Sequence, residues 1–551
     1  MGCFFRKKSM KHSFINLLRE PDSVLFQYEN SVVRFEEPDS REEANSRLDY
    51  IVKDGFGKII VFPSKRPIKR IKLRWRGDLS DVISVLGDAL DVNCSYSYGF
   101  DLFACWHSII PERKMPWYFH TFDGERLNCF GVKTGPDAIC YFQCDECGIT
   151  LWLDLRNFSG GVSLKEPLLA AEVVCREGEL GENPFYAAHT FCKMMCENPV
   201  LPKTPIFGVN NWYWAYGNIS HDSIMDECDQ LMDMCADAVC KPYMIIDDGW
   251  QKNRFKNEYE KVYNGGPWAL SSTAFPSMRE TARLIREKGA VPGLWFRPLL
   301  TYGDLPAGFA SPFQTHPIGT FLDPTNPDVL SKIFNDVKNM VDAGFGLIKH
   351  DFTTLDTIGK FGELVDGDQH FYDNSVTNAT MMKRIYKTVQ AAAGDAEVTG
   401  CNTANHLVAG IHSSQRASRD TSGNLYEITR IAAASSFIRL PQNKAFFSLD
   451  PDCAPITERV PIEINLDFLE LCANAGVVTL GSIKPGIIKG KHLTRIRNIY
   501  KTASLGGNDA IPDRWVCNNA PSKFTSNDGK KLSCNWYNVY DGVRTFTTWK
   551  D

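Results

Sequence analysis

The sequence has no apolar run approaching the length of about 20 residues that a helix needs to cross a membrane. Its basic start, Met1 to Lys8, is not followed by the apolar segment of a secretory signal, and Arg6 stands where N-myristoylation requires Ser or Thr. There is no excess of positive charge either, since 61 Lys and Arg face 66 Asp and Glu and the net charge is −5. These absences predict a cytoplasmic protein that binds neither membrane nor nucleic acid.

Motifs for cofactors and metals are also missing. No Gly-rich phosphate loop follows any candidate strand, which argues against a dinucleotide cofactor. Many of the 18 cysteines lie in apolar segments, as Cys228 and Cys472 do, so we expect reduced thiols in the core. Cys144 and Cys147 have the spacing of a zinc or redox pair, but no second pair follows at ligand distance. We therefore predict neither a metal nor a cofactor.

The first part of the chain, residues 1–200, consists of short alternating segments separated by turns. A chain of 551 residues is expected to form two or three domains. Few helical stretches interrupt these segments, a pattern typical of an N-terminal β-sandwich. The candidate strands are residues 31–35, 58–62, 71–75, 140–143 and 150–155. The proline-rich residues 199–205 resemble a linker.

From residue 206 to about 485 the pattern changes to strand, loop and helix in repetition. Helical patterns cover residues 223–239, 277–288 and 327–343. Eight strands over roughly 280 residues predict a (β/α)8 TIM barrel, with an open doubly wound sheet as the weaker alternative. The candidate strands are residues 206–210, 243–247, 291–296, 346–351, 397–402, 413–420, 445–450 and 476–481. Residues 490–551, with aromatic segments at 534–537 and 545–549, predict a small C-terminal β domain.

Charged and aromatic residues follow these strands where each one ends. Residues 243–246 are apolar without interruption and lead directly into Asp247, Asp248 and Trp250. In a barrel the ligand binds at the C-terminal ends of the strands, so these side chains are expected to meet at one opening. Indole rings pack on the C–H face of a sugar, while acids and cations bind its hydroxyls. The same rule selects Asn210, Asn211, Trp212, Trp214, Trp295, Arg297, Lys349, Asp351, Cys401, Asn402, Arg416, Arg419, Asp420, Asp450 and Asp452.

Two of these acids fit the chemistry of glycoside cleavage with retention, which needs a nucleophile and an acid/base about 5 Å apart. Asp351 is the predicted nucleophile, because Lys349 lies two residues earlier on the same strand face and keeps the carboxylate ionised. Asp420 fits the acid/base by position. The structural alternatives are an ion pair of Asp351 with Lys349 and a helix N-cap at Asp420. For Asp450-Pro-Asp452, a turn without a role in binding is favoured over a ligand-binding role.

Five motifs in this order resemble glycoside hydrolase family 36, which includes α-galactosidases, α-N-acetylgalactosaminidases and raffinose-synthase-like proteins. They are residues 245–251, Gly293-Leu-Trp295, Lys349-x-Asp351, Arg416-x-Ser-x-Asp420 and Asp450-Pro-Asp452. The resemblance covers the predicted barrel, about half of the chain. The resemblance implies that Asp351 is the nucleophile and Asp420 the acid/base. By the same resemblance Asp247 and Asp248 would bind the axial 4-hydroxyl and the 6-hydroxyl of galactose, and Lys349 would bind ring hydroxyls. Trp212 or Trp214 would form the subsite wall, and Cys401, Asn402 and Arg416 would lie near the 2-position. Trp295 is a further candidate for the wall by its position, with filling of the barrel as the alternative. The resemblance also implies an assembly of identical chains.

Several residues depart from the pattern of that family. His350 stands where many relatives have Trp, and Arg297 stands where a carboxylate is common. Arg419 separates the serine from Asp420, which leaves the register of the acid/base open. Residues 400–405 lack a glycine cluster, so the choice between a 2-hydroxyl and a 2-acetamido group also stays open.

The predicted function is a retaining exo-glycosidase that removes terminal α-linked galactose from oligosaccharides or glycoconjugates through a covalent glycosyl-enzyme. An α-N-acetylgalactosaminidase and a galactosyl transferase are alternatives on the same site. A non-catalytic carbohydrate-binding protein is a further alternative. A Schiff-base aldolase using Lys349 is disfavoured, because a nearby acid raises the pKa of the amine instead of lowering it.

Overall fold

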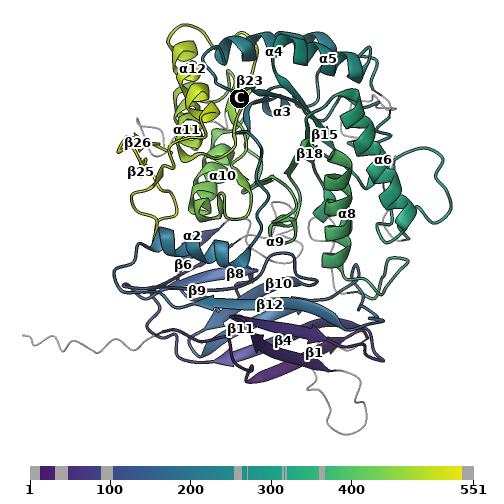
Figure 1. The fold of residues 1–551 in the computed structure, drawn as a ribbon, viewed down its shortest axis with the longest axis vertical. Helices are drawn as coiled ribbons and strands as arrows, with labels where there is room; N and C mark the ends of the chain where they lie inside the picture. The colour runs from purple at the N-terminus through teal and green to yellow at the C-terminus, as the bar shows by residue number, and fades with distance from the viewer. Residues whose placement is uncertain are drawn as a thin grey trace, which may run out of the picture.

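The computed structural model describes residues 13–30, 47–88, 104–252, 264–269, 271–312, 316, 319–358 and 367–536. It has an N-terminal antiparallel sandwich, a curled parallel sheet surrounded by helices, and a small antiparallel sheet near the end of the chain (Figure 1). The predicted fold class is therefore confirmed. The strands predicted at residues 31–35 and 545–549 lie outside the described residues, and the exact domain boundaries stay a prediction.

The N-terminal sandwich consists of two antiparallel sheets. One has the order β1-β4-β11-β10-β7 and the other the order β2-β3-β12-β9-β8-β5-β6. Buried and half-buried residues alternate along β4, as expected for a strand with one face in the core. The bounds are β1 Ser23–Tyr28, β2 Leu48–Lys53, β3 Phe56–Val61, β4 Ile68–Arg76, β5 Ser84–Gly87, β6 Cys105–His107, β7 Met115–Pro116, β8 Tyr118–Phe122, β9 Leu127–Val132, β10 Ile139–Asp145, β11 Gly148–Asp154 and β12 Leu168–Arg176. Four predicted strands fall in β3, β4, β10 and β11.

Helix α2, Pro184–Met195, lies between the sandwich and the barrel (Figure 1). Pro184 occupies the first turn, where its missing N–H costs nothing. The Asn183 side chain caps the helix by accepting a hydrogen bond from the Phe185 N–H at 2.9 Å. One side of α2 packs on β9 and the other on the short 3-10 helix η1, Leu440–Gln442. This helix therefore connects the two larger parts of the molecule.

The parallel sheet has the order β21-β20-β19-β18-β15-β14-β13-β23-β22. All eight predicted strands appear in it in the predicted order, and the Val478 N–H donates to the Leu449 carbonyl at 2.9 Å, which links the seventh strand to the eighth. The ninth, β22, forms because the chain returns after β21 to pair with β23. The bounds are β13 Phe207–Asn210, β14 Tyr243–Ile246, β15 Val291–Phe296, β18 Leu347–His350, β19 Glu397–Gly400, β20 Ser414–Arg416, β21 Ser448–Asp450, β22 Ala454–Ile456 and β23 Thr479–Ile483.

Helices cover the outside of this sheet (Figure 1). The predicted helices at 277–288 and 327–343 correspond to α5 and α6. The one predicted at 223–239 begins earlier, at His221 with a Ser220 capping box, and ends earlier, at Met234, after which residues 235–237 form a turn. The bounds are α3 Trp212–Ala215, α4 His221–Met234, α5 Met278–Lys288, α6 Pro327–Ala343, α7 Thr353–Ile358, α8 Asn378–Ala393, α9 Asn405–Val408, α10 Tyr426–Ile438, α11 Ile462–Ala475 and α12 Lys491–Ser504.

Smaller elements complete the fold. A hairpin joins β16, Leu300–Thr301, to β17, Thr320–Phe321, and a three-stranded antiparallel sheet contains β24 Ile511–Pro512, β25 Lys523–Thr525 and β26 Lys531–Ser533. Phe524 of β25 packs against Phe437 of α10, with ring centroids 5.4 Å apart. None of the helices among the described residues has the length and apolar character needed to span a membrane. The cysteines of the described residues are free thiols, and no group of His, Cys, Asp or Glu in that part of the chain is arranged to hold a metal.

Candidate active site

Asp247 and Lys349 form a buried ion pair at the C-terminal ends of β14 and β18. The Lys349 Nζ donates to Asp247 Oδ2 at 2.7 Å, and Asn210 Nδ2 donates to the same oxygen at 2.7 Å. The Asp248 N–H donates to the other oxygen at 2.9 Å. Burial opposes the charge on Lys349, but Asp247 outweighs it and holds the pKa of Lys349 well above its ordinary value. An amine held as ammonium cannot attack a carbonyl, so the geometry argues further against an aldolase.

Asp351 lies directly after β18 and accepts hydrogen bonds from three residues. Trp295 Nε1 donates to Oδ2 at 2.9 Å, and the Phe352 N–H donates to Oδ1 at 2.7 Å. Asn402 donates to Oδ1 through its side-chain amide and, at 3.3 Å, through its backbone N–H. These N–H donors fix the orientation of the side chain, and each one favours a negative charge on it. The structure thus brings Trp295, Asp351 and Asn402 together, three residues that the sequence selected from three different strands.

Arg416 on β20 connects Asp420 to a second acid. Its Nη2 donates to Asp420 Oδ1 at 3.1 Å and to Asp452 Oδ2 at 2.8 Å, and its Nη1 donates to Cys401 Sγ at 3.3 Å. Arg416 is enclosed, with 1% of its side chain exposed, whereas 56% of the Asp420 side chain is exposed. Asp420 therefore faces an open space at the end of the strand. It is also not a helix N-cap, because α10 begins at Tyr426 and Leu425 precedes it.

The surrounding protein atoms raise the pKa of Asp420 above its ordinary value, although more than half of its side chain is exposed. Arg416 opposes this effect, and the negative charges of Asp452 and Asp351 add to it. The negative charge of Asp351 thus disfavours ionisation of Asp420, as expected for two carboxyls at one opening.

Asp450 and Asp452 are buried at the same opening, so the Asp-Pro-Asp segment is more than a surface turn. Asp452 has a positive φ of 74°, unusual for a residue with a side chain, and it accepts hydrogen bonds from the Tyr213 hydroxyl and, at 2.8 Å, from the Thr421 N–H. Its own N–H donates to Asp450 Oδ1 at 2.9 Å. Burial raises the pKa of Asp450 to about 6, although Arg416 opposes the rise. Asp452 therefore supports the chain on either side of Asp420.

Asp248 lies beside Asp247 and is also buried. Its Oδ1 accepts a hydrogen bond from Gln251 Nε2 at 2.5 Å. Burial, opposed by the Gln251 bond and assisted by the charge of Asp247, raises the pKa of Asp248 to about 7. Near neutral pH this carboxyl can both donate and accept a hydrogen bond, which suits a hydroxyl ligand.

The aromatic residues at the opening fall into two groups. Trp250 donates from Nε1 to the Trp295 carbonyl at 3.0 Å, and the Trp268 ring lies 5.7 Å from Trp250 and 5.8 Å from Trp295. Trp214 instead donates from Nε1 to Glu227 of α4 at 3.0 Å. Trp212 stands at the start of α3, with its ring 5.7 Å from that of Tyr216. The structure brings Trp295 to Asp351, whereas the indole nitrogen of Trp214 contacts the surrounding helix.

Arg297 occupies the position at which a carboxylate is common in the resembling family. Its guanidinium forms a two-pronged ion pair with Asp356, from Nε at 2.8 Å and from Nη2 at 2.6 Å, and lies 4.1 Å from the centroid of the Phe352 ring. Both charged side chains are buried, with 3% and 1% exposed. Arg297 is thereby held by its own acid behind Phe352, the residue that follows Asp351.

This buried pair gives a prediction about stability. Asp356→Ala leaves the Arg297 charge buried with one polar partner fewer, so we expect the free energy of unfolding to fall by about 3–5 kcal/mol. Asp342→Ala removes the exposed pair with Lys338 and should cost at most about 1 kcal/mol. Urea denaturation of the three proteins measures both changes. Equal losses in the free energy of unfolding for the two variants would contradict the prediction that the buried pair contributes more to stability than the exposed pair.

Sequence reasoning missed some residues of the site. Tyr213 contacts Asp452 from α3, and Gln251 holds Asp248, but neither residue type is diagnostic of a site. Asn210, which the strand-end rule does select, is shown by the structure to be a hydrogen-bond partner of Asp247. His350, by contrast, is turned away from the opening and packs on His412, with ring centroids 5.4 Å apart. Burial lowers the pKa of His350 to about 3, so the ring is neutral.

Solved structures with a similar fold include α-galactosidases. An α-galactosidase from Thermus thermophilus, solved with p-nitrophenyl α-D-galactopyranoside, is 15% identical and matches with a TM-score of 0.58 over 88% of this chain and 95% of that one. A family 36 α-galactosidase from Geobacillus stearothermophilus is 11% identical, with a TM-score of 0.57 over 87% of this chain and 71% of that one. An α-galactosidase from Lactobacillus brevis is 12% identical, with a TM-score of 0.57 over 92% and 75%.

Variants of the Geobacillus stearothermophilus enzyme have been crystallised with raffinose and stachyose. No protein-family model matches the sequence. The chain is thus structurally similar to glycoside hydrolase family 36 α-galactosidases across most of its length, and at this level of identity the similarity establishes the fold.

Proposed function

We propose that this chain is a retaining exo-α-galactosidase of the cytoplasm that acts on terminal α-galactosyl groups of oligosaccharides or glycoconjugates. The observation that carries the proposal is the contrast between two acids at one opening. Asp351 is enclosed by N–H donors, whereas Asp420 has an exposed side chain paired with Arg416. Retaining glycosidases need two carboxyls with different surroundings, one as nucleophile and one as acid/base.

In the proposed reaction the Asp351 carboxylate attacks the anomeric carbon while Asp420 gives its proton to the leaving oxygen. The glycosyl–Asp351 ester is then hydrolysed by a water that Asp420, now ionised, deprotonates. Asp247 and Lys349 present an acceptor and a donor that are already paired and oriented, so binding a hydroxyl needs little rearrangement. Asp248, with a pKa of about 7, completes the hydroxyl-binding group.

The ring wall and the 2-position belong to the same proposal. Trp212, partly exposed at the start of α3, is the indole proposed to pack on the C–H face of the sugar. Trp295 is 2% exposed and is proposed to support Asp351 from behind through its indole N–H. Cys401, Asn402 and Arg416 lie next to one another through the Arg416–Cys401 contact and form the wall proposed for the 2-position. An α-N-acetylgalactosaminidase and a galactosyl transferase use the same groups and remain the alternatives.

A screen of p-nitrophenyl α-glycosides tests this function. We expect the α-galactoside to be cleaved with a kcat/KM at least about a hundredfold above that of the α-glucoside, because the site is built around hydroxyl-binding acids that discriminate an axial from an equatorial 4-hydroxyl. Proton NMR of the first product should show the α-anomer, as retention requires.

The same screen separates the alternatives. Faster cleavage of the α-N-acetylgalactosaminide would move the assignment to that activity, and a trisaccharide formed from added sucrose would indicate transfer. Absence of turnover together with saturable galactose binding would leave a carbohydrate-binding protein. A β-configured first product would exclude the retaining mechanism.

A further inference from the structure

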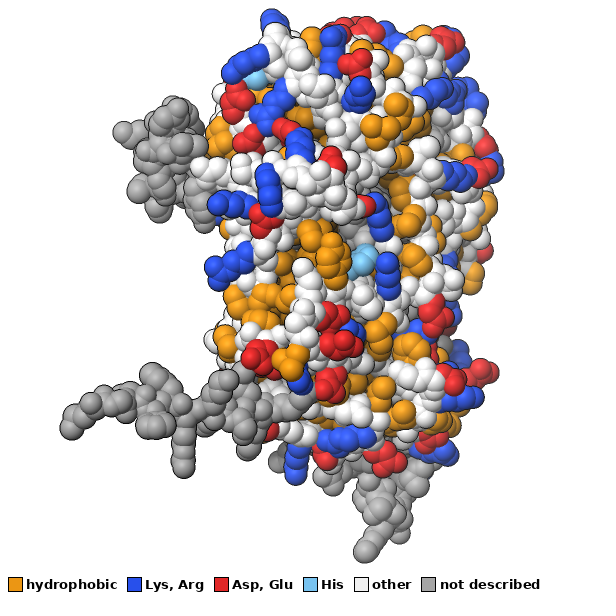
Figure 2. All heavy atoms as spheres, turned by 60° about the vertical axis from the view of Figure 1, so that its left-hand side comes forward, with side chains coloured by type: hydrophobic (Ala, Val, Ile, Leu, Met, Phe, Trp, Pro, Cys, Tyr) orange, Lys and Arg blue, Asp and Glu red, His pale blue; other side chains and the backbone are white. Residues whose placement is uncertain are grey.

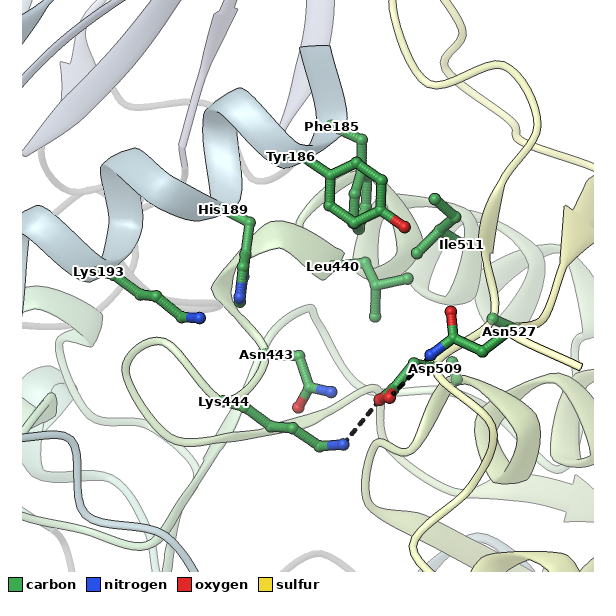
Figure 3. A pocket seen from close by; sticks show the side chains of 12 residues that line it. Phe185, Tyr186, His189, Lys193, Leu440, Asn443, Lys444, Asp509, Ile511 and Asn527 are labelled. Atoms are coloured by element: carbon green, nitrogen blue, oxygen red, sulfur yellow. Dashed lines mark hydrogen bonds and ion pairs between the residues drawn. The ribbon is translucent and has the colours of Figure 1, made fainter. Parts of the chain in front are cut away.

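A cavity of about 310 Å³ lies where α2, the barrel and the C-terminal sheet meet (Figure 3). It is far from the acids described above, because its barrel residues precede strands β21 and β23 whereas the acids follow strand ends. Its volume is in the range of sites for small molecules. The residues that line it are Phe185, Tyr186, His189, Lys193, Leu440, Asn443, Lys444, Ala475, Asp509, Ala510, Ile511 and Asn527.

One wall of the cavity is apolar and aromatic. Phe185 and Tyr186 of α2 stand opposite Leu440 and Ile511, and half of the Tyr186 side chain is exposed. Hydrophobic side chains gather in the middle of the face that carries α2 and the C-terminal strands (Figure 2). A half-exposed aromatic ring beside aliphatic side chains favours a ligand with an apolar ring or chain.

The charges of the lining do not balance. Lys444 pairs with Asp509 at 2.8 Å, and Asn527 donates to the other oxygen of Asp509 at 3.3 Å, so that acid is fully engaged. Lys193, in the last turn of α2, makes no ion pair with any residue in the part of the chain that the structure describes. The cavity therefore has one unbalanced positive charge, which favours an anion.

His189 adds a group that can change state when an anion binds. Its Nδ1 lies 2.9 Å from the Pro441 carbonyl, and since a carbonyl only accepts, Nδ1 carries a hydrogen and Nε2 is left for the cavity. The His189 ring and the Lys193 side chain both extend from α2 toward this space (Figure 3). Burial lowers the pKa of His189, and Lys193 and Lys444 add to the effect, while the Pro441 bond and Asp509 oppose it. A bound anion would also oppose this lowering of the His189 pKa, because it favours the positively charged ring.

We propose that this cavity, the junction site, binds a small organic anion whose carboxylate or phosphate contacts Lys193 and His189 and whose apolar ring packs on Phe185 and Tyr186. Such a ligand touches α2, the segment that leads into β21, and the C-terminal sheet at once. Because it binds only when these parts are docked, it stabilises the folded protein by mass action.

Four probes test the junction site in the full-length protein: phenyl phosphate, benzoate, inorganic phosphate and benzyl alcohol. By calorimetry, phenyl phosphate or benzoate should bind saturably and raise the Tm. Inorganic phosphate lacks the ring and benzyl alcohol lacks the charge, so each should bind at least about tenfold more weakly than the matching anion. No saturable binding of either aromatic anion, or equal binding of benzyl alcohol, would overturn the proposal.

The affinities of matched variants test whether the anion binds at the junction site. Lys193→Gln and Tyr186→Ala should each weaken phenyl phosphate by about tenfold, whereas Lys53→Gln on the edge strand β2 should bind as the parent does. Asp351→Asn, at the other site, should also leave the affinity unchanged. In NMR titrations, the His189 pKa should rise when the anion is present. Parent-like binding by Lys193→Gln, or loss of binding in Asp351→Asn, would exclude the junction site.

Discussion

Asp351→Asn is expected to lower kcat on p-nitrophenyl α-galactoside by at least about a thousandfold, because an amide cannot form the glycosyl ester. The change alters few atoms, and the amide oxygen can keep the donors of Oδ1, so that only the Trp295 hydrogen bond to Oδ2 is lost and the fold should be kept. Steady-state kinetics and the Tm of the same preparations measure the two effects. Because KM depends on hydroxyl contacts elsewhere, it should change by less than about tenfold.

The control for this prediction is Asp342→Asn, which changes an exposed acid on α6 in the same way. It should keep the parent kcat. A parent-like kcat in Asp351→Asn would contradict the proposed mechanism. The remaining explanation of this residue would be the structural ion pair with Lys349. A large drop in Tm would instead indicate that Asp351 acts through stability, and galactose binding by the folded variant would then decide between the two.

Much of the architecture could be predicted from the strand pattern, because buried parallel strands are short apolar runs and charged residues follow them in the sequence. Lys349 and Asp351 reach the opening and His350 does not, as the alternation of a strand requires. The Tyr243–Ile246 run is wholly buried, as its lack of polar residues predicts.

The directions of the other side chains could not be obtained this way. Trp212 and Trp214 were predicted together from their position after β13, but that segment forms a helix, α3, in which residues two apart point to different sides. Trp214 then finds Glu227 on a neighbouring helix, a partner that no local pattern identifies. The ion pair of Arg297 with Asp356 could not be predicted for the same reason, since the two residues are 59 positions apart.

The Asp-Pro-Asp segment shows how a local rule can be outweighed by packing. Taken alone, Asp450-Pro-Asp452 is well suited to an exposed turn. In the fold it lies beside β20, and the buried guanidinium of Arg416 supplies the positive charge that two enclosed acids need. The burial of these two acids therefore depends on Arg416, a residue more than 30 positions away in the sequence. The sequence pattern does not reveal this contact.

Asp420→Ala is expected to slow raffinose hydrolysis by about 10²–10⁴-fold, because the fructosyl-glucose leaving group needs a proton as its bond breaks. A 2,4-dinitrophenyl α-galactoside leaves as a stable anion, so formation of the glycosyl-enzyme from it should slow by less than about tenfold. Burst kinetics with the dinitrophenyl substrate and steady-state rates with raffinose separate the two steps. Equal losses on both substrates would contradict the acid role and indicate that Asp420 only orients Arg416.

The pH dependence of the parent enzyme gives the matching control. The acid works only when protonated, so kcat/KM for raffinose falls as pH rises through the pKa of Asp420 in the free enzyme. Because the surrounding protein and the negative charges of Asp452 and Asp351 raise that pKa, the fall should lie above the range of an ordinary aspartate. Arg416→Met removes the charge that opposes the rise and should move the fall to still higher pH. In Asp420→Ala the fall should disappear, and if it persists unchanged, another group supplies the proton.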